Sequence, residues 1–273
     1  METHVDHGFA LVTGSGSGIG KAIALELAKS NFPVVVNDIN EAAGEQAVAA
    51  ISDDGGQAYF IPADVSDANA VMTMFDEAER QFGKLGILVN NAGTPGKFAL
   101  LTDMADQDWR TNISVHIDGA FYCLREAARR MVNGGHIVSI ASIAGLNGTI
   151  GSAAYAAAKA AVINLTKTAA KELAASGISV NAIAPGMVAT PINQKLANQD
   201  SPFIAAALEG VPTNRMTDPQ EIADLVSFLC QPANAITGQI IALDSGASLA
   251  APIDRFMLNF LQNNRAAPKQ EIG

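Results

Sequence analysis

Stretches of consecutive apolar residues, rich in β-branched side chains, alternate along the chain with longer segments of helical period. The apolar stretches predict strands at 9–14, 34–38, 58–63, 87–93, 136–142, 178–186 and 239–246. Because they are continuously apolar rather than alternating, they are typical of parallel strands covered on both faces. The segments between them predict helices at 18–30, 41–53, 68–82, 105–131, 152–175 and 219–230.

This alternation predicts one α/β domain over residues 1–273, with a doubly wound parallel sheet of about seven strands and helices on both faces. Residues 187–218 contain three prolines and no clear strand. A connection this long in a compact domain is usually functional, so we expect it to form a lid. A C-terminal extension, residues 247–273, follows the final predicted strand.

Composition narrows the classes of function. The 273 residues are 49% apolar, which is ample for a core, and their net charge of −10 argues against binding to nucleic acids or anionic membranes. No apolar run approaches the roughly 18 residues that span a bilayer, and no secretory signal is evident at the N-terminus. Two widely separated cysteines, Cys123 and Cys230, make no disulfide framework. We therefore expect a cytoplasmic protein.

The first predicted strand leads into the glycine-rich string TGSGSGIG, residues 13–20, which opens the first predicted helix. Its glycines permit a tight turn and a close backbone approach, and the helix N-terminus then directs free N–H groups toward a pyrophosphate. A sharp turn needs glycine on its own account, but the strand before and the helix after fit the dinucleotide-binding motif. The string therefore predicts a Rossmann-type fold that binds a dinucleotide.

The second predicted strand ends at Asp38, 18 residues after Gly20. A carboxylate there can accept both hydrogens of an adenosine ribose diol and would repel a 2′-phosphate. Neither Ser15 nor Ile39 supplies a cation for such a phosphate, so NAD is favoured over NADP, although Asp38 could equally cap the next helix. Asp64 either meets the adenine edge or begins a turn. The expected NAD-binding residues in these segments are Gly14, Ser17, Gly18, Ile19, Gly20, Asp38, Asp64, Val65, Asn91, Ala92 and Gly93.

The string YAAAK places Tyr155 and Lys159 four residues apart, on one face of a helix. By itself this spacing also fits a surface pair on an alanine-rich helix. Ser142 lies 13 residues before Tyr155, at the end of a predicted strand, where ligands bind in such sheets. A tyrosine has a pKa near 10, and a cation about 4 Å away in a shielded site can lower it by about three units. Lys159, helped by a positive nicotinamide, would therefore suffice to lower the pKa of Tyr155.

These features together resemble the short-chain dehydrogenase/reductase family in its single-domain form. The matching segments are the glycine string, NNAG at 90–93, Ser142, the Tyr155–Lys159 pair and NAIAPGMVAT at 181–190, so the resemblance covers about residues 5–246. It implies that Tyr155 is the acid/base, that Ser142 holds the substrate oxygen and that Lys159 binds the nicotinamide ribose. It also implies further cofactor contacts at Tyr155, Lys159, Pro185, Gly186, Val188 and Thr190.

One position departs from the family pattern. Trp109, Gly119 and Phe121 keep the frame around the fourth catalytic residue, usually asparagine, but here that residue is His116. In the family this residue perturbs its helix and helps to hold a water that leads from the lysine to solvent. We expect His116 to add a ring nitrogen to that path and to titrate near pH 6.5, with Asn112 as a partial substitute. The alternative is a histidine that only packs in the core.

The leading prediction is an NAD-dependent enzyme that interconverts a secondary alcohol and a ketone, without a metal, on a small apolar or cyclic substrate. The alternatives are a lyase or epimerase on the same scaffold and a non-catalytic NAD-binding regulator. A homotetramer is expected, because the alanine-rich faces of 105–131 and 152–175 allow close helix packing between subunits. The apolar substrate pocket is predicted from Leu146, Met187, Val188, Leu196, Phe203, Ile204 and Leu208.

Overall fold

The computed structural model describes residues 8–191, 193–194, 202–232 and 234–249. At its centre lies a parallel seven-stranded sheet in the order β3-β2-β1-β4-β5-β6-β7. Its strands are β1 (Phe9–Val12), β2 (Val34–Asp38), β3 (Ala58–Pro62), β4 (Leu85–Asn90), β5 (Gly135–Ile140), β6 (Ile178–Pro185) and β7 (Ile240–Leu243). The predicted doubly wound sheet is thus confirmed. From β1 the strands are added outward to β3 on one side, and from β4 they are added outward to β7 on the other side.

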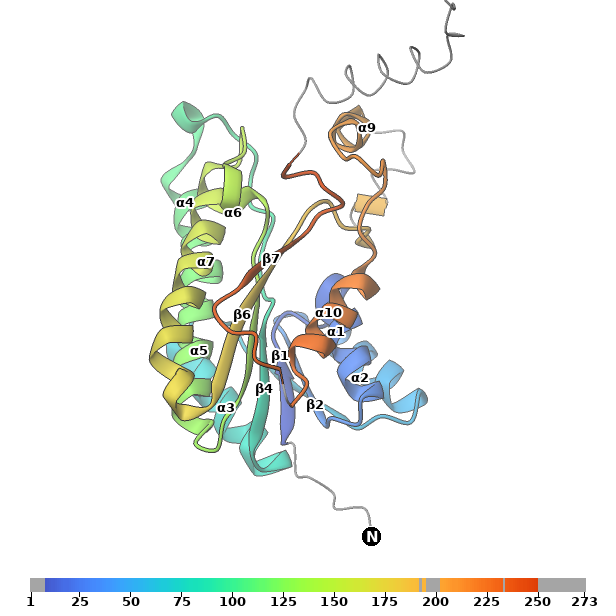
Figure 1. Ribbon diagram of the computed structural model, residues 1–273, viewed down its shortest axis with the longest axis vertical. Helices are drawn as coiled ribbons and strands as arrows, with labels where there is room; N and C mark the ends of the chain where they lie inside the picture. The colour runs from blue at the N-terminus through green and yellow to red at the C-terminus, as the bar shows by residue number, and fades with distance from the viewer. Residues whose placement is uncertain (1–7, 192, 195–201, 233, 250–273) are drawn as a thin grey trace, which may run out of the picture.

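Helices cover both faces of the sheet, as Figure 1 shows. One face carries α1 (Gly18–Lys29), α2 (Glu41–Asp53) and α10 (Pro219–Leu229). The other carries α3 (Ala68–Phe82), α4 (Asp106–Ile113), α5 (Gly119–Arg130) and α7 (Ala153–Leu173). Each face has its own buried cluster of Ala, Val, Ile and Leu, which explains why the strands are apolar on both sides.

The long helix predicted over 105–131 is not continuous. α4 ends at Ile113, a π-helical turn (η2, Ser114–Asp118) follows, and α5 begins at Gly119. Periodicity could not show this, because a π turn inserts one residue without changing the apolar character of the segment, and such turns are frequent at functional sites. The structure also contains short helices that we did not predict: η1 (Leu101–Asp103), α6 (Ala144–Asn147) and η3 (Ala174–Ser176).

Only part of the predicted lid can be described. It contains α9 (Pro202–Glu209), and the bridge between Val188 and Thr217 ties its two ends together. Leu196 and residues 250–273 of the predicted C-terminal extension lie outside the described residues. None of the helices that the structure describes is long and apolar enough to cross a membrane.

Candidate active site

The glycine-rich string forms the turn between β1 and α1. Gly14 and Gly18 have φ angles of 61° and 55°, a left-handed backbone that side chains disfavour. A Cβ on Gly20 would collide with the Gly14 carbonyl oxygen and the Asn91 amide. Ser17 precedes α1 and makes no capping hydrogen bond with its side chain, so the first N–H groups of the helix stay available to a ligand.

The segment after β4 braces this turn. The Asn91 amide donates to the carbonyl oxygens of Thr13 and Gly14, both at 2.9 Å. The Thr13 hydroxyl oxygen accepts from the N–H groups of Asn91 and Ala92, both at 3.0 Å. The side chain of Asn91, a residue predicted to bind the cofactor, therefore stabilises the conformation of the glycine turn.

Asp38 lies beside the same turn. One of its carboxylate oxygens accepts from the Gly16 N–H and the other from the Asn40 N–H, both at 2.9 Å. The residue that caps α2 is Asn40, so the alternative role of Asp38 as the cap is wrong. Ser15 donates back to the Val12 carbonyl oxygen at 2.7 Å, and Ile39 is exposed, so neither position offers a cation near Asp38.

The segment after β3 leaves both interpretations of Asp64 open. Its carboxylate accepts from the N–H and the hydroxyl of Ser66, at 2.9 and 2.8 Å, which forms a turn and leaves the residue exposed. The Val65 side chain is buried against Gly119. We therefore expect Val65 to meet the nucleotide through its backbone.

The catalytic candidates converge at the carboxyl end of β5. Ser142 follows this strand, accepts from the Ala144 N–H at 3.1 Å and lies close enough to the Tyr155 hydroxyl to affect its pKa. Lys159 donates to the Ile140 carbonyl oxygen at 2.7 Å, and its Nζ lies 5.7 Å from the centre of the Tyr155 ring. Lys159 is only 5% exposed, so the alternative of a surface pair on α7 is wrong.

The pKa values of this pair follow from burial. Burial raises the pKa of Tyr155, and the neighbouring Ser142 hydroxyl only partly offsets this effect. Burial lowers the pKa of Lys159 to about 8. In the ligand-free protein the net effect of the surrounding groups is to raise the pKa of Tyr155, and the lowering expected from Lys159 together with a bound nicotinamide stays a prediction. Further positive charge, such as that of an oxidised nicotinamide, is needed to stabilise the phenolate.

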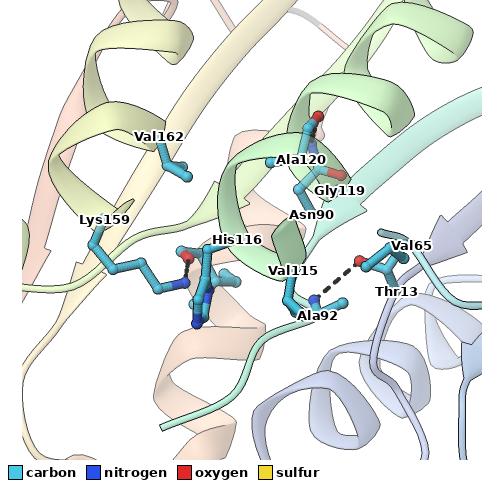
Figure 2. Close-up of a pocket in the computed structure, with 11 residues that line it drawn as sticks. Thr13, Val65, Asn90, Ala92, Val115, His116, Gly119, Ala120, Lys159 and Val162 are labelled. Carbon is cyan, nitrogen blue, oxygen red and sulfur yellow. Dashed lines mark hydrogen bonds between the residues drawn. The ribbon is translucent and has the colours of Figure 1, made fainter. Parts of the chain in front are cut away.

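His116 lies in the π-helical turn and faces the same residues, as Figure 2 shows for Lys159. Its Nε2 lies 2.8 Å from the Thr94 carbonyl oxygen and 3.2 Å from the Thr94 nitrogen. Its ring meets the Tyr155 ring edge-on, with centroids 5.3 Å apart. A Cβ on Gly93 would collide with the imidazole, so the glycine after β4 makes room for His116.

One expectation about His116 is wrong. Burial and the nearby Lys159 charge lower the pKa of His116 to about 3, so it does not titrate near pH 6.5. The Asn112 amide nitrogen donates to the Asp108 carbonyl oxygen of the same helix at 3.0 Å, and the part of Asn112 as a partial substitute for His116 stays a prediction. His116 is buried, yet it contacts Thr94 and Tyr155 and lies near Lys159, so it does more than fill an apolar core.

The low pKa of His116 makes the fold sensitive to acid. Below pH 6.5 His116 binds a proton in the unfolded chain, whereas in the folded protein it stays neutral down to about pH 3. The free energy of unfolding therefore decreases as the pH drops through this window. The loss between pH 7 and pH 5 should be about 2 kcal/mol. The His116→Asn variant lacks this titrating group and should lose less stability between pH 7 and pH 5. Chemical denaturation of the wild type and the variant at both pH values measures the two losses, and equal losses would contradict the low pKa of His116.

The segment after β6 closes the site from the other side. The Thr190 methyl group lies 3.5 Å from where a Cβ on Gly18 would stand, so this segment approaches the glycine turn. Pro185 accepts from the Ile143 N–H at 3.1 Å, and Gly186 packs against Asp244. The predicted contacts at Pro185, Gly186 and Thr190 thus lie between the glycine turn and the Ser142 segment.

The predicted apolar pocket is assembled only in part. Leu146 in α6 is 43% exposed, and Met187 is partly exposed beside the Val188–Thr217 bridge. Val188 and Ile204 are buried and pack within the protein. An unpredicted apolar residue, Ile150, lies just before α7 and is 91% exposed.

The arrangement fits a nicotinamide dinucleotide. The left-handed turn at Gly14 and Gly18 and the free helix start suit a pyrophosphate, and the Asp38 carboxylate beside the turn suits a ribose diol. Tyr155 and Lys159 lie at the carboxyl edge of the same sheet, where the nicotinamide end of such a cofactor would lie. The residues present therefore match the group that the sequence predicts.

Comparisons with known proteins agree with this geometry. Residues 14–248 match the family model described as enoyl-(acyl carrier protein) reductase. A 3-oxoacyl-[acyl-carrier-protein] reductase of Synechocystis is 40% identical, over 87% of this chain and 95% of the relative. A 3beta-hydroxysteroid dehydrogenase of Mediterraneibacter gnavus is 35% identical, over 88% and 95%. The chain therefore belongs to the short-chain dehydrogenase/reductase family, whose oxidoreductases use a nicotinamide cofactor.

Solved structures give the same result. A putative gluconate dehydrogenase of Agrobacterium tumefaciens superimposes with a TM-score of 0.85 at 33% identity, over 89% of this chain and 97% of the other. A variant of actinorhodin polyketide ketoreductase with NADPH gives 0.84 at 31% identity, over 89% and 98%. The Rossmann-type fold that the sequence predicted is thereby confirmed.

Proposed function

We propose that this chain is an NAD-dependent dehydrogenase or reductase that interconverts a secondary alcohol and a ketone on a small apolar or cyclic substrate. The observation that carries the proposal is the convergence of Ser142, Tyr155 and Lys159 beside the glycine turn, with Ser142 near the Tyr155 hydroxyl and Lys159 buried next to the Tyr155 ring. A regulator that only binds a nucleotide has no need of this arrangement.

Each residue has a distinct part in the reaction. Tyr155 removes the hydroxyl proton of the alcohol, and it returns a proton when a ketone is reduced. The Ser142 oxygen already accepts from Ala144, so its own O–H can donate to the substrate oxygen. Lys159 uses one N–H on Ile140 and has two left for the cofactor ribose and for stabilising the phenolate. When bound, the nicotinamide accepts or returns the hydride.

An absorbance assay of NADH formation across a substrate panel tests the proposal. The panel should hold simple, cyclic and steroid secondary alcohols, together with 3-hydroxyacyl thioesters. We expect turnover of at least one secondary alcohol and its reversal with the ketone. Substrate conversion without any change in NADH would favour the lyase or epimerase. Cofactor binding without conversion would favour the regulator.

A second candidate differs only in substrate. The relative from Synechocystis is named as a reductase of 3-oxoacyl groups on acyl carrier protein, and several relatives from Staphylococcus carry the same name at 39% identity. The hydroxysteroid dehydrogenase relative supports a cyclic substrate instead. Reduction of a 3-oxoacyl thioester at a higher kcat/KM than any cyclic ketone would establish the second candidate.

The preference for NAD depends on Asp38. Its carboxylate lies at the glycine turn without a nearby cation at Ser15 or Ile39, so a 2′-phosphate would meet repulsion. We expect kcat/KM to be at least about tenfold higher with NAD than with NADP, an interaction difference of about 1.4 kcal/mol. Asp38→Ser should narrow this ratio, whereas Asp64→Ser should leave it unchanged. Equal kcat/KM values in the wild type would contradict the role of Asp38.

We also propose a homotetramer. Trp109 of α4 and Phe121 of α5 are 42% and 41% exposed on the outer face of the molecule, and the exposed side chains of α7 include Ala157 and Ala160. Exposed aromatic groups beside small residues favour close helix contacts between subunits. Light scattering should give a mass near four times 28.2 kDa. Trp109→Glu together with Phe121→Glu should give smaller species, and a wild-type monomer at micromolar concentration would contradict the proposal.

A further inference from the structure

Four large apolar side chains are exposed at the carboxyl end of the sheet, where the candidate active site lies. Leu100 and Leu101 lie between β4 and α4, and Leu146 and Ile150 lie between β5 and α7. Their exposed fractions are 60%, 77%, 43% and 91%. Single apolar residues are normal on a protein surface, but a contiguous group of them marks a binding site. We call these four residues the apolar shelf.

The two segments that carry the apolar shelf are joined to each other. The Ala99 N–H donates to the Gly151 carbonyl oxygen at 3.0 Å. The Phe98 ring lies 3.8 Å from where a Cβ on Gly151 would stand. Leu100 and Ile150 are the next residues along the chain from this hydrogen bond, so the leucines of one segment and the isoleucine of the other belong to one surface.

The apolar shelf borders the catalytic candidates. The short helix α6 begins just after Ser142 and carries Leu146. Its Gly145 packs so closely on the backbone of Lys159 that a Cβ would have no room, which seats α6 on α7. Figure 1 shows α6 and α4 at the same end of the sheet as α9 of the lid. A substrate held between Ser142 and Tyr155 can therefore reach the shelf with the part that leaves the site.

The apolar shelf carries no charge. Residues 98–101 and 146–151 contain no acidic or basic side chain, and their polar side chains are those of Asn147 and Thr149. Lys97, just before the first segment, is paired with Asp108 at 3.7 Å. A ligand with a phosphate or a carboxylate on its distal part would find no cation on these two segments, whereas a neutral hydrocarbon would bury apolar surface there.

We propose that the apolar shelf binds the neutral hydrocarbon body of the substrate, a chain or fused rings, while the carbinol or carbonyl group lies between Ser142 and Tyr155. This inference rests on the proposed function and narrows it to secondary alcohols and ketones whose apolar body reaches beyond the catalytic residues. Leu101 and Ile150 are the specificity-determining residues, because they are the most exposed of the four and have the most surface to bury. Each CH₂ group that contacts the shelf should raise kcat/KM about two- to fourfold.

A series of straight-chain methyl ketones, from 2-butanone to 2-decanone, tests the shelf through the rate of NADH oxidation. We expect kcat/KM to rise with chain length through a falling KM, because the apolar contact is the same in the ground state and in the transition state. Leu101→Asn and Ile150→Asn should each flatten this rise. Both variants should keep the wild-type kcat/KM for 2-butanone, which is too short to reach the shelf.

Val132→Asn is the matched control for these variants. Val132 is 78% exposed, almost the same as Leu101, but it lies between α5 and β5 at the opposite end of the sheet. The control should keep the wild-type rise with chain length. A rise that is the same in the wild type and in both shelf variants, or one that the Val132 variant also loses, would overturn the proposal. So would smaller species of the shelf variants in light scattering, because the shelf would then be a subunit contact.

Titration calorimetry separates the shelf from the proposed function, because it needs no turnover. The ligand-free wild type should bind 2-decanone more tightly than decanoate, and Ile150→Asn should weaken the binding of 2-decanone at least about fivefold. This result without turnover of any ketone would mean that the proposed function fails while the shelf stands. Tighter binding of decanoate, or turnover that does not depend on chain length, would overturn the shelf and leave the proposed function intact.

Discussion

Tyr155→Phe should lower kcat for alcohol oxidation by about 10²–10⁴-fold, the range that a general acid or base contributes. The hydroxyl oxygen is the only group lost, and it is the group that exchanges a proton with the substrate in the proposed reaction. The ring remains, so its edge contact with His116 and its packing on α7 remain as well. NADH should therefore bind with an unchanged Kd.

Stopped-flow turnover and fluorescence titration of NADH measure the two quantities separately. Tyr59→Phe is the matched control, since Tyr59 lies in β3 and its hydroxyl donates to Glu77 at 3.2 Å on the surface. It should leave both quantities unchanged. Retained turnover in the Tyr155 variant would remove this residue from the mechanism, and a weakened Kd would mean that the hydroxyl holds the cofactor instead.

Lys159→Met should abolish detectable turnover and at the same time stabilise the ligand-free protein. Burial lowers the pKa of Lys159 to about 8 from 10.5, so keeping it charged at pH 7 costs about 3 kcal/mol of folding free energy. Methionine removes this cost but leaves the Ile140 carbonyl without its donor, which costs about 1–3 kcal/mol. A net gain of about 1 kcal/mol should remain.

The pH dependence of this gain identifies its cause. Above about pH 8 the folded wild type releases the lysine proton while the unfolded chain holds it up to about pH 10, so wild-type stability rises through this window. The difference between the variant and the wild type should therefore shrink as the pH rises. Urea denaturation at pH 7 and pH 9 measures it, with Lys167→Met on the exposed face of α7 as the control. A variant that is less stable at pH 7, or a gain that does not change with pH, would contradict this account.

The fold could be predicted because each strand is continuously apolar and each helix follows at short range. The helices predicted at 41–53 and 68–82 have the same bounds as α2 and α3. The glycine-rich string also gave the correct start of α1, at Gly18. Periodicity does not show the break in the helix over 105–131, but the resemblance implies that the residue at position 116 perturbs its helix, and the π-helical turn Ser114–Asp118 contains His116.

The residues of the candidate site could be predicted, but their pKa values could not. Ser142, Tyr155 and Lys159 are recognisable from their spacing, and the structure brings them together. Their electrostatics were not predictable, because burial decides the pKa values of Tyr155, Lys159 and His116, and burial is a property of the packed molecule. Thr94 was missed as a partner of the site, since nothing in its local sequence shows that it meets His116.

Transfer of deuterium is the most direct test of the central claim that this chain moves a hydride between a carbinol carbon and NAD. A secondary alcohol from the panel, deuterated at the carbinol carbon, is incubated with the enzyme and NAD, and the NADH is examined by mass spectrometry. The account predicts one deuterium in every NADH formed, and none formed with Tyr155→Phe over the same time. Product that forms without labelled NADH would contradict it.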